Sequence, residues 1–144
     1  NVPSFLWSKT GGKVMVSNEG KEILRDIGLL AEHIICTADS YGEVADKRKV
    51  VIDISETAAR AKKEVKHISI KDLKMLNDKY GIAIFEYVDM LDAAARKEPY
   101  NNNEVRFKAD AVVSIVLDII HREIRSSEIY RKISEGVVNE NVQI

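Results

Sequence analysis

The stretch VIDISETAARAKKEVKHI, residues 51–68, decides the fold class. Its apolar residues recur at alternating steps of three and four positions, along Val51, Ile54, Ala58, Ala61, Val65 and Ile68. This spacing places them on one face of an α-helix, as a narrow heptad-like seam whose small alanines allow a neighbouring helix to approach closely. The stretch lies in a proline-free region from Ser4 to Glu98. Because proline interrupts helices, such a region can hold very long helices.

The same spacing extends outward in both directions. It predicts helices over residues 18–40, 43–67, 70–97 and 103–135, and therefore more than about 60% helix. Ser17 and Ser69 can cap two of these helices, and Gly42 and Gly136 suit helix ends. The helical phase continues through Gly81, so we expect this glycine to lie within a helix. The predicted fold is a single all-α domain, residues 1–144, folded as an antiparallel up-and-down four-helix bundle.

The two ends of the chain differ from the helical region. Residues 1–17 contain Gly11-Gly12 between two short apolar runs, which predicts a β-hairpin or, as the alternative, an extended arm that covers the bundle with Trp7. Residues 137–144 are expected to form a frayed tail. The chain begins with Asn1 rather than Met, which indicates a processed or trimmed product.

Composition excludes several classes of protein. Of 144 residues, 45% are apolar and 31% charged, and the net charge of −1 favours neither nucleic acid nor an anionic membrane as a partner. No apolar run reaches the roughly 20 residues that span a bilayer. The single Cys36 excludes an internal disulfide and favours a reducing, cytoplasmic setting. Its place in a predicted helix indicates a small packing residue.

Two segments, residues 82–91 and 112–119, carry apolar residues around more of the helix than one seam needs. Folding the chain back about Pro99 sets these segments side by side, with Tyr80 near Ile120. We expect a protein partner, most simply a second copy of the chain, to cover the excess. The predicted interface residues are Trp7, Phe85, Val88, Val112, Ile115, Val116 and Ile119.

Two carboxylate–histidine pairs resemble metal ligands at i, i+3 spacing. They are Glu64 with His67 and Asp118 with His121, and the bridging carboxylates would be Glu32 and Glu86. Their helical phase places the two pairs beside the apolar seams rather than on them. We therefore expect no metal, and no sequence motif indicates any other cofactor.

Two further functions compete with a non-enzymatic interaction module. Residues 73–92, with Gly81 at a turn, could form a helix-turn-helix with a wing over residues 96–108, and a helix break at Gly81 would favour this nucleic-acid-binding function. The recognition helix would be residues 84–92, which contain no Lys or Arg. A small helical hydrolase or RNase is the other alternative, since Arg60 and His67 resemble the arginine–histidine pair of helical RNases, although Ala61 replaces the usual polar residue. We predict no catalytic residue.

Overall fold

The computed structural model describes residues 15–136, of which 83% are helical and none is in a strand. The all-α prediction is thereby confirmed. Five α-helices and one short 3₁₀ segment (η1) follow one another along this part of the chain: α2 (Asn18–Asp39), η1 (Tyr41–Glu43), α3 (Lys47–Val65), α4 (Ile70–Tyr80), α5 (Ile84–Arg96) and α6 (Asn102–Ser134). None of the described helices is both long enough and apolar enough to cross a membrane.

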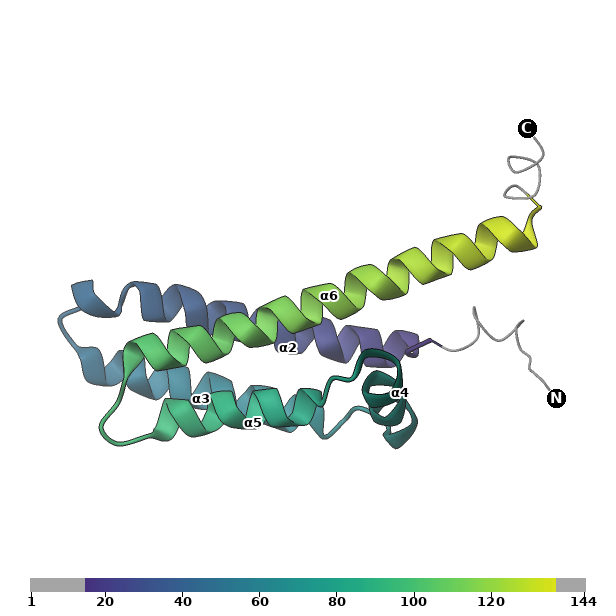
Figure 1. The fold of residues 1–144 in the computed structure, drawn as a ribbon. Helices are drawn as coiled ribbons and strands as arrows, with labels where there is room; N and C mark the ends of the chain where they lie inside the picture. Colours follow the sequence, from purple (N-terminus) through teal and green to yellow (C-terminus); the bar gives the residue numbers. More distant parts are fainter. Residues whose placement is uncertain (1–14, 137–144) are drawn as a thin grey trace.

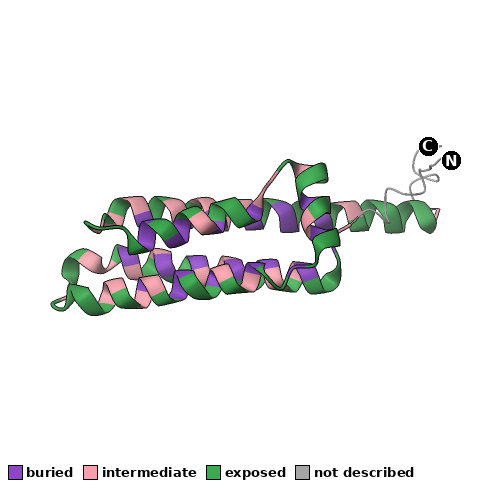
Figure 2. Cartoon of the chain, turned by 90° about the horizontal axis from the view of Figure 1, so that it is seen from below, coloured by how far each residue is buried: buried purple, intermediate pink, exposed green. Residues whose placement is uncertain are grey.

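Four of the helices pack side by side around a shared core (Figure 1). Helix α2 contacts α3 and α6, and α5 contacts the same two helices from the opposite side, so the four form a closed ring. The buried residues line the inward faces of these helices (Figure 2). The largest apolar side chains with essentially no exposure include Leu24, Ile27, Ile34, Ile54, Leu91 and Ile119.

The predicted seam of α3 is confirmed. Its core residues Ile54, Ala58 and Ala61 have no exposed surface, and Val65 is only 1% exposed. The alanines leave room for α2 and α5, which both pack along α3. The heptad spacing in residues 51–68 therefore identified the inward face of this helix correctly.

The region predicted as one helix over residues 70–97 is two helices, and this prediction was wrong. Helix α4 ends at Tyr80 and α5 begins at Ile84. Between them Gly81 has φ +66°, a left-handed conformation that only glycine adopts without strain, and its N–H bonds to the carbonyl of Asn77. Helix α4 consequently lies across one end of the ring, whereas α5 runs along it (Figure 1).

The start of α2 is connected to α4 through side chains. Ser17 caps α2, with its Oγ accepting the N–H of Gly20 at 2.9 Å, and Ser69 caps α4 by accepting the N–H of Asp72 at 3.1 Å. The Asp72 carboxylate, 3% exposed, accepts the N–H and the hydroxyl of Ser17 at 3.0 and 2.6 Å. Asp72, whose N–H is capped by Ser69, thus binds the start of α2 with its side chain.

Helix α6 extends well past the ring. Its 33 residues make it about 50 Å long, and its C-terminal part projects beyond the ends of the neighbouring helices (Figure 1). Between residues 124 and 134 no residue is buried. This projecting end is therefore in contact with little or nothing else in residues 15–136.

The N-terminal hairpin is not supported. Residues 15–136 contain no strand, and Met15, Val16 and Ser17, the last part of the predicted hairpin, are not in one. Val16 instead is buried and donates its N–H to the Glu123 carboxylate at 2.8 Å, so this segment bonds to a helix rather than to a paired strand. The rest of the predicted hairpin, with Trp7, and the predicted tail lie outside the described residues.

Candidate functional site

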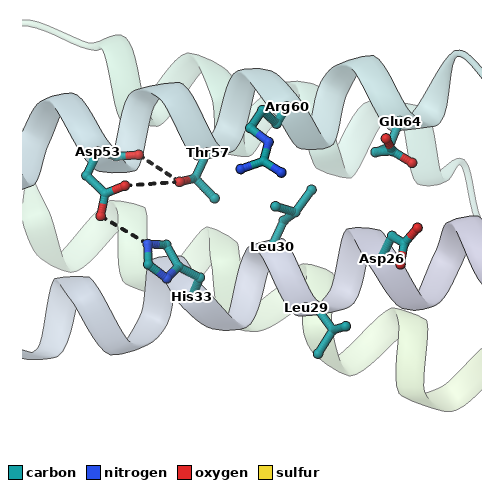
Figure 3. A pocket seen from close by; sticks show the side chains of 8 residues that line it. All are labelled: Asp26, Leu29, Leu30, His33, Asp53, Thr57, Arg60 and Glu64. Atoms are coloured by element: carbon teal, nitrogen blue, oxygen red, sulfur yellow. Dashed lines mark hydrogen bonds and ion pairs between the residues drawn. The ribbon is translucent and has the colours of Figure 1, made fainter.

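A polar groove of about 620 Å³ runs between α2 and α3 (Figure 3). Its lining mixes acidic, basic and apolar side chains: Asp26, Leu29, Leu30, His33, Asp53, Thr57, Arg60 and Glu64.

One ion pair and the hydroxyl of Thr57 lie at the end of this groove near His33, and Thr37 lies one helical turn after His33 on α2. The imidazole Nε2 of His33 lies 3.0 Å from Oδ2 of Asp53, with both side chains about half exposed. Thr57 donates its hydroxyl hydrogen to the backbone carbonyl of Asp53 at 2.8 Å, and Thr37 donates to the carbonyl of His33 at 2.8 Å. Oγ1 of Thr37 also lies 3.4 Å from Nε2 of His33, a longer contact than the one to the carbonyl. Because Nε2 lies closer to Asp53, and both hydroxyls make their shortest bonds to backbone carbonyls, the arrangement does not favour either threonine as a nucleophile.

The structure does not bring the proposed RNase pair into one site. Arg60 lines the α2–α3 groove, whereas His67 follows the end of α3 at Val65 and is not part of the groove lining. Glu64, the other member of its carboxylate–histidine pair, also lines the groove, which His67 does not. No group of three or more His, Cys, Asp or Glu side chains within residues 15–136 could hold a metal ion.

The helix break at Gly81 is the feature that a helix-turn-helix requires. Helix α5, the candidate recognition helix, packs between α3 and α6, and its exposed face carries Glu86. Residues 96–108 form the end of α5, a loop and the start of α6 rather than a β-wing. Three basic side chains there already pair with carboxylates at 2.6–2.8 Å: Arg96 with Asp92, Lys97 with Glu104, and Arg106 with Asp39. An acidic helix and neutralised bases do not favour phosphate binding.

The predicted interface residues divide into two groups. Four of them lie in the core of a single chain, with exposures between 0 and 3%: Val88, Val112, Val116 and Ile119. Phe85 is 46% exposed and Ile115 is partly buried, so only these two described residues remain at the surface. The wide apolar faces of α5 and α6 are thus partly covered by the other helices of the ring, and Trp7 lies outside the described residues.

Exposed apolar side chains concentrate on α6. Twelve large apolar residues are exposed in residues 15–136, and six of these belong to this one helix: Phe107, Leu117, Ile124, Ile129, Tyr130 and Ile133. The sequence analysis did not single out any of the six as an interface residue. A signal existed, because Val113, Leu117, Ile120 and Ile124 form a second seam with steps of four, three and four.

This second seam borders an apolar groove of about 310 Å³ between α2 and α6. From α2 the groove is lined by Arg25, Gly28, Leu29 and Glu32, and from α6 by Val113, Val116, Leu117 and Ile120. The two helices approach closely at Gly28, since a Cβ added there would lie 3.1 Å from a Val116 methyl group. The absence of a side chain at Gly28 therefore helps to set the spacing of these helices.

A buried carboxylate on α6 joins this helix to the segment before α2 and to the end of α4. Glu123 of α6 has no exposed surface, and it accepts hydrogen bonds from the N–H of Val16, from Lys79 at 2.8 Å and from the Tyr80 hydroxyl. Burial alone would raise the pKa of Glu123, but the three donors outweigh it and lower the pKa below its ordinary value. The sequence analysis missed this residue, although its spacing from Val112, Val116 and Ile119 continues the inward seam.

Cys36 is exposed, so its prediction as a packing residue was wrong. It lies on the outer face of α2, two residues after the buried Ile34, rather than in the core. We expect one thiol per chain to react with an aromatic disulfide reagent in native buffer, without denaturant. The measurement is the absorbance of the released thiolate, with Cys36→Ser as the control. A thiol that reacts only after unfolding would contradict the exposed position.

Comparison with protein-family models, with curated proteins and with solved structures finds no match for this chain.

Proposed function

We propose that this protein is a non-enzymatic four-helix-bundle module that binds protein chains through helix faces and associates with itself. The observation that carries the proposal is the concentration of exposed apolar side chains on α6. Monomeric proteins rarely leave large contiguous apolar patches uncovered. A helix that carries half of the large exposed apolar residues of residues 15–136 is therefore the element to which a partner would bind.

The polar groove supports this proposal indirectly. Catalysis by a nucleophile needs a hydroxyl or thiol that bonds to its base. The hydroxyls of Thr37 and Thr57 make their shortest bonds to backbone carbonyls, and the contact of Thr37 with Nε2 of His33 is longer, at 3.4 Å. Exposed ion pairs such as His33–Asp53 contribute little energy and are common between neighbouring helices. The groove is thus accounted for by helix packing, without an enzymatic role.

Within the proposed module, α6 is a better contact surface than α5. Most of the interface residues first predicted on α5 and α6 are needed for the core, which leaves Phe85 and Ile115. The outer face of α6 combines Leu117, 51% exposed, with Ile124, 44% exposed, about two turns further along the same seam. We therefore propose that self-association uses this face of α6.

A pair of charge substitutions tests the proposal. We expect the unmodified chain to form dimers reversibly at micromolar concentrations, and Leu117→Lys to weaken association by at least about tenfold, because a buried charge at an interface is costly. Phe85→Glu is the matched control, since Phe85 is exposed to a similar extent on another helix. Sedimentation equilibrium over a range of concentrations gives the masses. A chain that stays monomeric at every concentration would refute the proposed self-association.

A further inference from the structure

We propose that two copies of the chain associate about a two-fold axis that passes midway between their α2 helices, at the level of Gly28 and Leu29, with the α2–α6 groove of each copy facing the other. This inference rests on the proposed self-association and adds the surface, the symmetry and the pairs of residues in contact. Its occupant is a second copy of the same chain.

The apolar part of the groove fits a helix-sized partner. Leu29 of α2 is 64% exposed and Leu117 of α6 is 51% exposed, and both line the groove. Between them lie Val113, which is partly buried, and Ile120, which is 8% exposed. Each copy therefore carries an exposed leucine, Leu29, beside an apolar groove. In a symmetric pair, each copy can insert its leucine against the groove of the other.

Two opposite charges flank this apolar surface on α2. Arg25 and Glu32 both line the groove and are seven residues apart, about 10 Å along the helix axis. Within residues 15–136 neither side chain forms a hydrogen bond or an ion pair, in contrast to the paired bases of residues 96–106. The groove therefore presents one positive and one negative group that have no partner in the described part of the chain.

A two-fold axis would pair these charges with each other. Such an axis makes the two α2 helices antiparallel, and in an isologous interface each contact occurs twice. When the axis passes between positions 28 and 29, position 25 of one copy faces position 32 of the other. Arg25 then meets Glu32 of the second copy, Glu32 meets Arg25 of the second copy, and each Leu29 faces the small Gly28.

The same register creates no repulsion at the next pair of positions. One turn further out, position 21 of one copy faces position 36 of the other, which sets Lys21 opposite the uncharged Cys36. An axis placed at residue 25 or at residue 32 would instead bring like charges together. This is the only antiparallel register in which the two groove-lining charges, Arg25 and Glu32, pair with each other, and the groove supplies the apolar contact at its centre.

Charge reversal in the full chain tests this symmetry directly. Arg25→Glu places two acidic side chains opposite each other in both pairs, and Glu32→Arg places two basic ones there. We expect each single variant to self-associate at least about tenfold more weakly than the unmodified chain in sedimentation equilibrium at low salt. An equimolar mixture of the two variants should recover a dimer, because both mixed pairs are then of opposite charge.

The double variant R25E/E32R should also recover self-association, since it exchanges the two charges and keeps them complementary. Asp26→Arg is the matched control, because Asp26 is an exposed acid of α2 that lines the α2–α3 groove instead, and its association should equal that of the unmodified chain. Circular dichroism establishes that each variant keeps its helix content.

The outcomes separate the two proposals. If the unmodified chain is monomeric at every concentration, both the proposed self-association and this geometry are wrong. If it dimerises but the single variants dimerise equally well, or if the mixture fails to recover a dimer, only the two-fold geometry is wrong. Dimerisation that depends on Leu117 but not on the charges would mean that the two copies meet through α6 in another arrangement, and would likewise overturn the geometry.

Discussion

Replacing Glu123 with alanine should reduce the free energy of unfolding by about 3 kcal/mol, because a buried set of donors would lose its common acceptor. Glu123 is fully buried and accepts hydrogen bonds from Val16, Lys79 and Tyr80. These three donors come from the segment before α2, from the end of α4 and from its last residue. The substitution therefore weakens the attachment of two elements to α6 at the same time.

Denaturant unfolding measures this effect, and Glu128→Ala is the matched control. Glu128 is exposed on the projecting end of the same helix, so its removal should change stability by no more than about 0.5 kcal/mol. Equal stabilities of the two variants would contradict the role that we assign to the buried carboxylate.

The pH dependence of the Glu123 effect has a defined sign. Because the pKa of Glu123 is lower in the folded state than its ordinary value, the charged form stabilises the fold at a pH above the unfolded value of about 4.3. This contribution is lost as the pH falls through the folded pKa. The stability difference between the unmodified chain and Glu123→Gln should therefore be constant near neutrality and shrink below about pH 4.

Gly20→Ala should destabilise the protein by about 2 kcal/mol, the range expected for overpacking a tight site. In an ordinary helix the same substitution stabilises by up to about 1 kcal/mol. Here a Cβ would lie 2.5 Å from Oδ2 of Asp72 and 2.9 Å from a methyl carbon of Val16. The Asp72 carboxylate is buried and bonded twice to Ser17, so moving it would break the connection between α4 and α2.

Thermal or denaturant unfolding checks the Gly20 prediction, with Gly42→Ala as its control. A Cβ at Gly42 would have no neighbour within 4 Å, so this change should leave stability almost unaltered. A Gly20→Ala protein that is as stable as the unmodified chain would mean that Asp72 can move at no cost.

The seams of the helices could be predicted from sequence, whereas the break at Gly81 entered only as part of the helix-turn-helix alternative. The spacing of Tyr80, Ile84, Tyr87 and Leu91 stays helical, since the residues between α4 and α5 replace almost one turn of helix. A left-handed glycine changes the direction of the axis without changing this spacing. The spacing of apolar residues shows which residues share a helix face, but it does not give the angle between successive helices.

The exposed face of α6 could not be predicted from the spacing of apolar residues, because the spacing does not show which residues the other helices cover. Apolar residues surround much of α6, and only the positions of α2, α3 and α5 decide which of them are covered. Val112 and Val116 face the core, while Leu117 remains exposed beside them. By contrast, Arg25 and Glu32 are visible in the sequence as a charged pair two turns apart, but nothing in the sequence shows that both border an apolar groove.

The length of α6 affects how the size of this molecule should be measured. A helix of about 50 Å that projects beyond the ring raises the frictional coefficient, so one copy diffuses more slowly than a sphere of 16.2 kDa. On a gel-filtration column such a monomer elutes early, at the volume of a larger globular standard. Elution volume alone would therefore mistake an elongated monomer for a dimer, whereas light scattering reports the mass independently of the Stokes radius.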